Sequence, residues 1–251
     1  MNPVEADLSI FSLTGKTILV AGASKGIGLA IAEGLAQAGA NVVGFGRSSA
    51  SASLLFRYKQ CDVLDRSGFT SMAGACVQEY GAINAYFHVA GITEPANGAM
   101  QNIDAFEETL RVNLTSAYFC CRQVGTLMMN QNKGSIVTVT SIGSMLAFPN
   151  NPGYVASKGG LRMMSKALAL DLGKFNIRVN SLVPGYIHTD MTHSSYSDPE
   201  KSAIRSERTM LGRWGQTRDL IGAAIFLASD ASSYITGTDL VVDGGWTAKG
   251  L

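Results

Sequence analysis

The sequence predicts an α/β protein built on one doubly wound parallel sheet of about seven strands with helices on both faces. Two observations predict this class. Short segments rich in β-branched residues alternate with longer segments of helical periodicity along the 251 residues, and such alternation is typical of a parallel sheet covered on both sides. In addition, no linker or internal repeat divides the chain, so residues 1–251 are expected to form a single domain.

The predicted strands are short and rich in β-branched and aromatic residues. In chain order they are 17–21, 41–45, 57–61, 85–89, 135–140, 177–183 and 239–242. Between most of them, apolar residues recur at helical spacing. The predicted helices are 27–38, 67–80, 103–130, 154–173 and 218–229. The stretch 48–53 is low in complexity and leaves little room for a helix between the second and third strands.

Composition excludes several classes of function. With 46% hydrophobic and 16% charged residues, the chain is typical of a compact globular protein. The net charge is +1 without a basic run, so no nucleic-acid partner is expected. The sequence has no leader pattern and no apolar stretch of bilayer length, so no membrane partner is expected either. The cysteines show no metal-binding spacing, which predicts no metal and favours buried free thiols in a reducing cytoplasm; they are Cys61, Cys76, Cys120 and Cys121.

A glycine-rich segment follows the first predicted strand and opens the first predicted helix. It reads Gly22-Ala23-Ser24-Lys25-Gly26-Ile27-Gly28. Glycines permit the turn and let a pyrophosphate approach the backbone, while the helix N-terminus offers free N–H groups. The spacing is G-x-x-x-G-x-G instead of G-x-G-x-x-G. It indicates a dinucleotide phosphate site, and the alternative is a purely structural strand-to-helix turn.

A tyrosine and a lysine begin the fourth predicted helix. Tyr154 and Lys158 are four residues apart, which places both on one helix face. A free tyrosine, with a pKa of about 10, is a poor base near neutrality, and a fixed cation brings its proton into a useful range. Ser141 lies thirteen residues upstream of Tyr154, at the end of a predicted strand. The pattern suggests an enzyme; alternatively, the tyrosine packs on the lysine stem.

Asn113 interrupts the apolar stripe of the long predicted helix. The stripe consists of Phe106, Leu110, Ala117, Cys121, Val124 and Met128. A buried amide needs hydrogen-bond partners. Two interpretations stay open: the amide caps or bonds local backbone, or it holds a water or positions another catalytic group.

Together these residues resemble the short-chain dehydrogenase/reductase family, a Rossmann-like family, over nearly the whole chain. The resemblance rests on the glycine loop, Asp62 after the third strand, Ala90-Gly91 after the fourth, Asn113, Ser141, Tyr154, Lys158, and Pro184-Gly185 with Thr189. It implies that Tyr154 is the general acid/base and that Ser141 bonds the substrate carbonyl. Lys158 would bind the nicotinamide ribose and lower the tyrosine pKa, and Asn113 would hold a water that links Lys158 to solvent.

The same resemblance implies a nicotinamide dinucleotide site spread along the chain. Its expected residues are Gly22, Ser24, Lys25, Gly26, Ile27, Gly28, Arg47, Ser48, Asp62, Val63, Ala90, Gly91, Tyr154, Lys158, Pro184, Gly185, Ile187 and Thr189. At the end of the second strand, an acid would accept bonds from a ribose 2′-OH, whereas an arginine accommodates a 2′-phosphate. Gly46 and Arg47 stand there, and Lys25 adds a cation. NADP(H) is therefore expected to be preferred, with NAD(H) possible.

Two positions depart from the family pattern near the cofactor. Ala21 stands where Thr is usual, and His88-Val89 replaces Asn-Asn before Ala90-Gly91. Both changes remove polar side chains that help to tie neighbouring strands, and His88 is a candidate to replace that tie. We expect His88 to be a hydrogen-bonded core residue and not a catalytic base.

Segment 186–210 is expected, by resemblance, to form a helical lid over the substrate. Its polar side chains are His188, His193, Tyr196, Arg205 and Arg208, and Ser144, Asn150 and Asn151 follow the predicted catalytic serine. These groups favour a hydroxylated or acidic substrate over a steroid-like one; alternatively, the lid charges form its solvated outer face. The segments 211–215 and 242–246 resemble those of gluconate-type sugar-acid dehydrogenases and also those of 3-oxoacyl-carrier-protein reductases.

The sequence thus predicts an NADP(H)-dependent oxidoreductase that interconverts a secondary alcohol and a ketone on a small polar substrate, polyhydroxylated or a sugar acid. One alternative is a 3-oxoacyl-[acyl-carrier-protein] reductase. A second alternative is a catalytically silent cofactor-binding sensor or scaffold. Resemblance also implies a homotetramer built on the helices 103–130 and 154–173.

Overall fold

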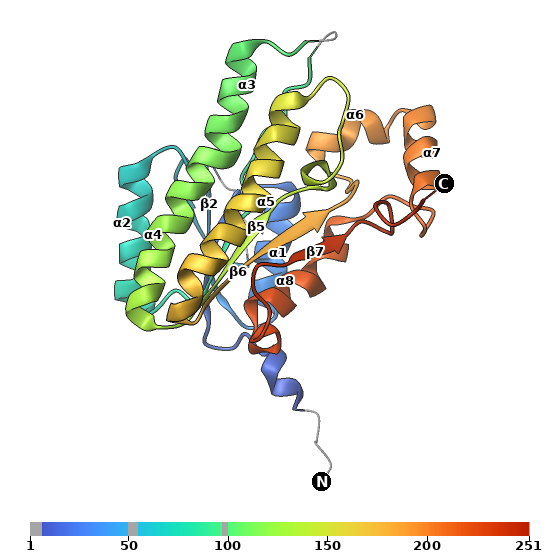
Figure 1. Cartoon of the computed structure of the whole chain (residues 1–251). Coiled ribbons are helices and arrows are strands. Elements are labelled where there is room, and N and C mark those ends of the chain that lie inside the picture. The colour runs from blue at the N-terminus through green and yellow to red at the C-terminus, as the bar shows by residue number, and fades with distance from the viewer. Residues whose placement is uncertain (1–6, 50–54, 97–99, 251) are drawn as a thin grey trace.

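The computed structural model describes residues 7–49, 55–96 and 100–250. Figure 1 shows a central sheet with helices in front of and behind it. Its strands run in the order β3-β2-β1-β4-β5-β6-β7, and each neighbouring pair is parallel. They are β1 (Thr17–Ala21), β2 (Asn41–Gly46), β3 (Arg57–Gln60), β4 (Ala85–His88), β5 (Gly134–Val139), β6 (Ile177–Pro184) and β7 (Asp239–Val242). The predicted fold class is confirmed.

The α-helices cover both faces of this sheet. They are α1 (Gly26–Gln37), α2 (Arg66–Tyr80), α3 (Ile103–Leu110), α4 (Ser116–Gln131), α5 (Pro152–Leu172), α6 (His193–Tyr196), α7 (Pro199–Arg208) and α8 (Ile221–Ala228). One core cluster joins α2, α4 and α5 to the sheet, and a second joins α1 and α8 to the opposite face. Because both faces are covered, β1 is buried at all five positions.

The prediction of one continuous helix over 103–130 is wrong in one respect. A π-helical turn, Arg111–Thr115, separates α3 from α4. There the Ser116 N–H bonds the Arg111 carbonyl, one residue further back than in an α-helix, and the Ser116 hydroxyl bonds the Val112 carbonyl at 2.6 Å. Such turns are common at functional sites, and this one carries Asn113.

The other boundaries differ only slightly from prediction. Segment 218–229 is a 3₁₀ turn, Thr217–Leu220, followed by α8. The turn forms because the Asp219 carboxylate accepts the Gln216 N–H at 2.7 Å and so fixes the entry to the helix. No strand end lies more than one residue from its predicted position. Residues 50–53 of the low-complexity stretch lie outside the described residues.

The cysteines are free thiols. Cys76, Cys120 and Cys121 are buried as predicted, whereas Cys61 is only half-buried because it follows the edge strand β3. Within the described ranges, no helix has the length and apolar character needed to cross a membrane.

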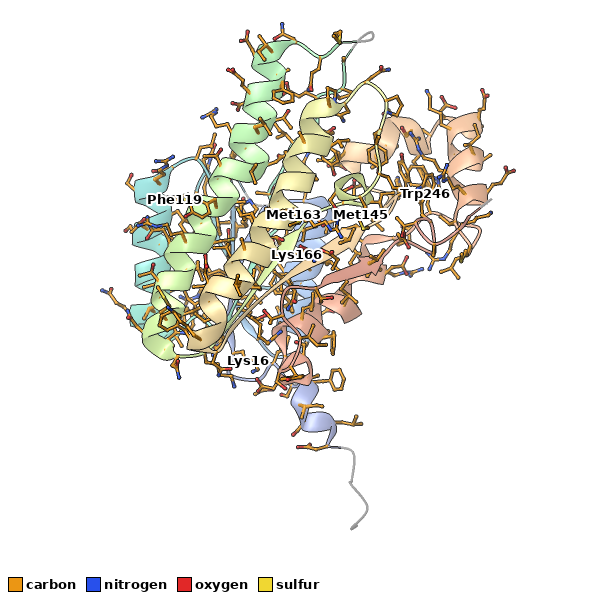
Figure 2. The ribbon with its side chains drawn as sticks, viewed as in Figure 1. Lys16, Phe119, Met145, Met163, Lys166 and Trp246 are labelled. Atoms are coloured by element: carbon orange, nitrogen blue, oxygen red, sulfur yellow. The ribbon has the colours of Figure 1, made fainter. Side chains whose placement is uncertain are left out.

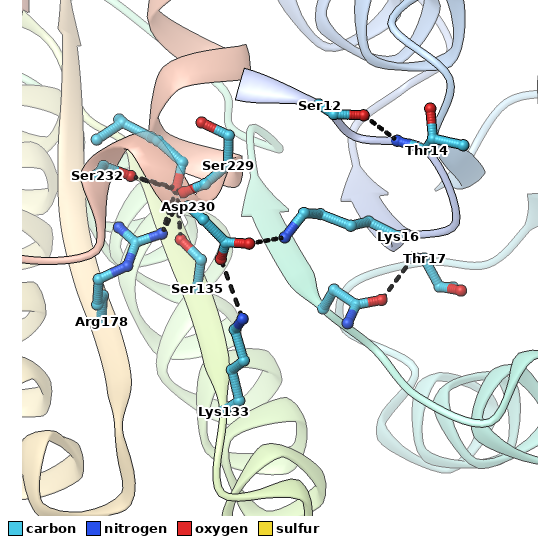
Figure 3. A network of polar contacts seen from close by, with 12 residues as sticks. Ser12, Thr14, Lys16, Thr17, Lys133, Ser135, Arg178, Ser229, Asp230 and Ser232 are labelled. Atoms are coloured by element: carbon cyan, nitrogen blue, oxygen red, sulfur yellow. Dashed lines mark hydrogen bonds and ion pairs between the residues drawn. The ribbon is translucent and has the colours of Figure 1, made fainter. Parts of the chain in front are cut away.

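The amino-terminal ends of the strands are held by a cluster of charges around Asp230 (Figure 3). Its two oxygens lie 3.0 Å from the Lys16 ammonium and 3.1 Å from that of Lys133. Arg178 donates to the carbonyl of Leu227 at 2.9 Å. These contacts tie the turn after α8 to β1, β5 and β6, and they leave the carboxyl-terminal ends of the strands free to form a site.

Candidate active site

A cavity of about 270 Å³ opens at the carboxyl-terminal ends of β1, β4, β5 and β6. The strand order reverses between β1 and β4, and open α/β sheets bind ligands at such a switch point. Every residue of the predicted cofactor set lines this cavity, together with Ser141. Asn113 does not reach its wall. The structure therefore brings together residues from many separate segments of the chain, whose roles stay predictions.

The glycine loop forms one end of the cavity. Gly22 and Gly26 adopt positive φ angles of 81° and 58°. A Cβ at Gly28 would lie 2.1 Å from the Gly22 carbonyl oxygen, and one at Gly22 would lie 2.8 Å from the Ala90 nitrogen. The N-cap residue of α1, Lys25, makes no side-chain capping bond, so the first N–H groups of α1 stay available to a ligand. The loop therefore fits a pyrophosphate.

The end of β2 forms the other side of the cavity. The Arg47 side chain is exposed. Hydrogen bonds fix the backbone there: the Arg47 carbonyl accepts one from the Gln60 amide at 2.7 Å, and the Ser48 carbonyl accepts one from the Tyr58 hydroxyl at 2.7 Å. A Cβ at Gly46 would lie 2.9 Å from that hydroxyl, so a carboxylate side chain would fit only if Tyr58 moved. Arg47 is thus the group placed to meet a phosphate here.

Across the mouth of the cavity, the Lys25 ammonium lies 3.4 Å from the Asp190 carboxylate. Both side chains are more than 70% exposed. Because solvent screens such a pair, the contact leaves Lys25 able to turn toward a second anion.

The first turns of α5 carry the tyrosine and the lysine. Lys158 is buried, and its ammonium donates to the Val139 carbonyl at 2.8 Å. It lies 5.8 Å from the centroid of the Tyr154 ring. Ser141 is the N-cap of the 3₁₀ turn after β5, and its Oγ accepts the Gly143 N–H at 3.0 Å. That bond orients the serine and leaves its hydroxyl proton for another acceptor.

Burial dominates the acidities of this pair. It raises the pKa of Tyr154 above its ordinary value, and a hydrogen bond with Ser141 lowers it in part. Burial also lowers the pKa of Lys158 to about 8. The direction is opposite to the lowering that the resemblance implies, and its largest cause is desolvation of the phenol.

Asn113 connects two segments far apart in sequence. Its Oδ1 accepts the Ile92 N–H at 2.8 Å, and its Nδ2 donates to the Ile92 carbonyl at 2.9 Å and to Ser157 Oγ at 3.0 Å. Ser157 in turn donates to the Tyr154 carbonyl at 2.7 Å. The backbone that Asn113 bonds is that of Ile92, twenty-one positions away in sequence, so it is not the local backbone of the first interpretation. The chain of bonds continues through Ser157 to the helix turn that carries Tyr154.

One residue of this network, Ser157, was missed by sequence reasoning, and a second, Gly91, has a contact beyond its predicted role. Ser157 joins Asn113 to α5, and the available signal was its place three residues after Tyr154, where a serine can bond the preceding helical carbonyl. Gly91 was assigned to the cofactor alone. A Cβ there would lie 3.2 Å from Asn113 Oδ1 and 3.4 Å from the Lys158 ammonium, so this glycine also makes room for these two polar groups.

His88 is fully buried at the end of β4. Its Nδ1 lies 2.7 Å from the Tyr86 hydroxyl, and its Nε2 has no hydrogen-bond partner among the described residues. The suggestion that His88 ties neighbouring strands is wrong, since residues two apart on one strand share a face and bond each other. Burial, and secondarily the charge of Lys158, lowers the pKa of His88 to about 3. The ring is therefore neutral.

Segment 186–210 folds as a 3₁₀ turn followed by α6 and α7. Figure 1 places both helices beyond the carboxyl-terminal ends of β6 and β7. The His188 and Tyr196 rings stack at 3.7 Å, whereas Arg208 is exposed. Near the serine, Asn151 is buried and donates to Thr93 Oγ1 at 2.6 Å. The polar groups are thus divided between an outer face and the interior, while closure over a substrate stays a prediction.

The chain matches a family model described as enoyl-(acyl carrier protein) reductase over residues 22–247. It is 36% identical to a 2-dehydro-3-deoxy-D-gluconate 5-dehydrogenase of Pseudoalteromonas atlantica, with 96% of this chain and 100% of that protein covered. It is 33% identical to a D-threitol dehydrogenase of Mycolicibacterium smegmatis, with 95% of each covered.

Among solved structures, a gluconate 5-dehydrogenase of Burkholderia cenocepacia in complex with NADP and tartrate superposes with a TM-score of 0.91. It is 34% identical, and the match covers 97% of this chain and 99% of that one. The similarity therefore extends over the whole sheet and the segments that line the cavity.

Proposed function

Because the chain belongs to the short-chain dehydrogenase/reductase family, we propose that it interconverts a secondary alcohol and a ketone of a polyhydroxylated substrate, with NADP(H) as hydride carrier. The observation that carries the proposal is the meeting of Ser141, Tyr154 and Lys158 at the end of the cavity that begins with the glycine loop. The residues proposed to transfer the proton and those proposed to bind the dinucleotide therefore line the same cavity.

The nicotinamide, when bound, supplies or accepts the hydride. In reduction, the Ser141 hydroxyl donates to the carbonyl oxygen of the substrate and fixes its orientation. Tyr154 then gives its proton to that oxygen, and in oxidation it removes the proton from the alcohol. The Lys158 cation stabilises the phenolate that remains. Asn113 and Ser157 hold the helix turn that carries Tyr154, and so act as positioning residues.

Preference for NADP(H) over NAD(H) is part of the proposal. Arg47 at the end of β2 and the absence of a side chain at Gly46 support it, because a cation in place of an acid at this strand end favours the 2′-phosphate. The Burkholderia relative in complex with NADP is consistent with this choice. Fluorescence titration with NADPH and NADH tests it, and equal affinity for the two would contradict it.

We infer that the substrate is a sugar acid or a related polyol. The named relatives act on a keto-deoxy sugar acid and on a four-carbon polyol, and both are polyhydroxylated. The alternative of a 3-oxoacyl thioester is tested in the same panel. Sugar acids, alditols and an acetoacetyl thioester should be compared with both cofactors by absorbance of the reduced nicotinamide.

The variant Tyr154→Phe tests the mechanism. It removes the transferable proton and keeps the ring, so turnover should fall by at least about 10³-fold while NADPH binding stays within about twofold. Retained turnover would refute the role of Tyr154. Cofactor binding by the native protein without turnover of any panel member would instead favour a silent sensor or scaffold.

A homotetramer built on α4 and α5 is also proposed. Apolar side chains on these helices face solvent: Tyr118 is 50% exposed, Met163 60% and Leu170 84%, and Figure 2 shows Met163 on the front face of α5. Such exposure is typical of an oligomer interface. Light scattering should give four times the 26.5 kDa chain mass, and a monomeric mass would contradict the assembly.

A further inference from the structure

The guanidinium of Arg205 lies on a cluster of aromatic rings in the lid segment. Its central carbon is 4.6 Å from the centroid of the Tyr186 ring and 5.7 Å from that of Trp214. Tyr186 also packs on Trp246 at 4.7 Å, and Figure 2 places Trp246 on the side of the molecule that carries α7. Flat aromatic faces stabilise a planar cation and hold it in one orientation.

This cation has no acidic partner within the described part of the chain. No ion pair there includes Arg205, and its Nη1 is buried without a hydrogen-bond partner. A buried guanidinium N–H left unbonded is unfavourable unless a ligand completes it.

The rings beneath Arg205 lead to the predicted catalytic residues. Tyr186 packs against Phe148 with ring centroids 6.1 Å apart. Phe148 and Tyr154 meet at Gly143, where an added Cβ would lie 2.8 Å from the first ring and 3.4 Å from the second. Successive contacts through two aromatic side chains, Tyr186 and Phe148, therefore connect Arg205 to Tyr154.

We infer that Arg205 binds the carboxylate of an acidic substrate whose carbonyl or alcohol group lies at Ser141 and Tyr154. The inference rests on the proposed function and deepens it, because it selects sugar acids over neutral polyols. A guanidinium offers two parallel N–H donors to one carboxylate. Arg205 is a specificity-determining residue in this scheme, and it takes no part in hydride or proton transfer.

The other cations of α7 are less suited to this role. Arg208 lies over Trp246 at 5.1 Å, but its side chain faces solvent. Lys201 already pairs with the Asp198 carboxylate at 2.7 Å, and its side chain is 60% exposed. Lys201 therefore provides a matched control, since its removal takes the same charge from the same helix without touching the aromatic cluster.

The experiment compares Arg205→Met with Lys201→Met on D-gluconate and on D-glucitol, its neutral counterpart, each with NADP⁺. Methionine keeps a flexible apolar stem on the rings. Loss of charge-assisted bonds should lower kcat/KM for gluconate by about 10- to 100-fold in Arg205→Met, mostly through KM. The value for glucitol should change less than about threefold, and Lys201→Met should resemble the native protein for both substrates.

Arg205→Lys serves as the conservative variant and should recover part of the loss, because it keeps the charge without the planar donor pair. Equal loss on gluconate and glucitol in Arg205→Met would indicate a structural role and overturn the inference. So would an unchanged gluconate KM.

A second measurement distinguishes failure of the carboxylate site from failure of the proposed function. If the native protein turned over neither substrate, gluconate binding to its NADP⁺ complex by calorimetry would still test the residue. Binding by the native chain that Arg205→Met abolishes would support the carboxylate site alone. Native binding that this variant leaves intact, or no native binding at all, would overturn the site.

Discussion

The ammonium of Lys158 donates a 2.8 Å hydrogen bond to the carbonyl oxygen of Val139, which joins the first turns of α5 to the end of β5. This contact holds the lysine at the junction of the cavity and the core, where its side chain is only 4% exposed. A cation in such a position is costly to bury, and the same desolvation sets its acidity.

Lys158→Met should therefore stabilise the protein near neutrality while it abolishes turnover. Burial lowers the pKa of Lys158 from 10.5 to about 8, which corresponds to a penalty of about 3 kcal/mol. Loss of the bond to Val139 offsets about 1 kcal/mol. Urea denaturation at pH 7 should show a gain of about 2 kcal/mol in the free energy of unfolding.

The pH dependence of this gain checks its cause. Below pH 8 the lysine is protonated in both states, so the penalty is complete. Between about pH 8 and 10.5 the unfolded chain binds the proton more than the folded chain does, and the native protein becomes relatively more stable as pH rises. The advantage of Lys158→Met should shrink from pH 7 to pH 10. A constant advantage would contradict burial of the charge as its origin.

Reduction of a ketone should become slower as pH rises above about 8. Lys158 loses its positive charge through this range, whereas the raised pKa of Tyr154 keeps the phenol protonated. Values of kcat/KM for a neutral ketone should fall toward tenfold per pH unit. NADPH affinity measured over the same range separates lost chemistry from lost binding, and a flat profile to pH 10 would exclude Lys158 as the titrating group.

Arg47→Ala should weaken NADPH binding by about 10- to 100-fold and change NADH binding by less than about threefold, since only NADPH carries the 2′-phosphate. Lys59→Ala is the matched control, because Lys59 is an exposed cation on the neighbouring strand and does not line the cavity. Fluorescence titration measures all four affinities. An equal loss of affinity for NADPH and NADH would show that Arg47 does not act on the 2′-phosphate.

The buried pair of Tyr86 and His88 should be coupled in stability. Tyr86→Phe leaves the His88 Nδ1 without its partner at 2.7 Å, which should cost about 1–3 kcal/mol. Tyr118→Phe, at a 50% exposed tyrosine, should cost under about 0.5 kcal/mol. Combined with His88→Ala in a double-mutant cycle, the pair should show a coupling of at least about 0.5 kcal/mol, and additive effects would mean that the contact contributes nothing.

Much of the fold could be predicted from the sequence because its signals are local. β1 and β7 begin and end at the predicted residues, since each β-branched run is bounded by turn residues. The π-helical turn could not be predicted, because residues 103–130 carry one continuous helical periodicity. Its extra residue is stabilised by bonds from Asn113 to Ile92, which is twenty-one positions away in the chain.

In the candidate site, too, local patterns could be predicted from the sequence and contacts between distant segments could not. Sequence reasoning selected Ser141, Tyr154 and Lys158 by residue type and spacing, and the fold brought them to one cavity. The lowered pKa expected for Tyr154 rests on a four-residue spacing, which says nothing of desolvation, the largest cause of its raised pKa. Ser157 was overlooked, because its importance comes from a partner on another element.

By itself, the sequence determined the class of fold, the dinucleotide loop and the type of chemistry, since each depends on which residues lie at short, regular spacings. The tertiary structure alone decided which of the polar lid residues faces the interior. Arg205 and Arg208 are three positions apart on α7, yet only Arg205 rests on Tyr186 with a buried, unbonded nitrogen. That difference arises from packing among distant aromatic rings, which no local pattern of residues records.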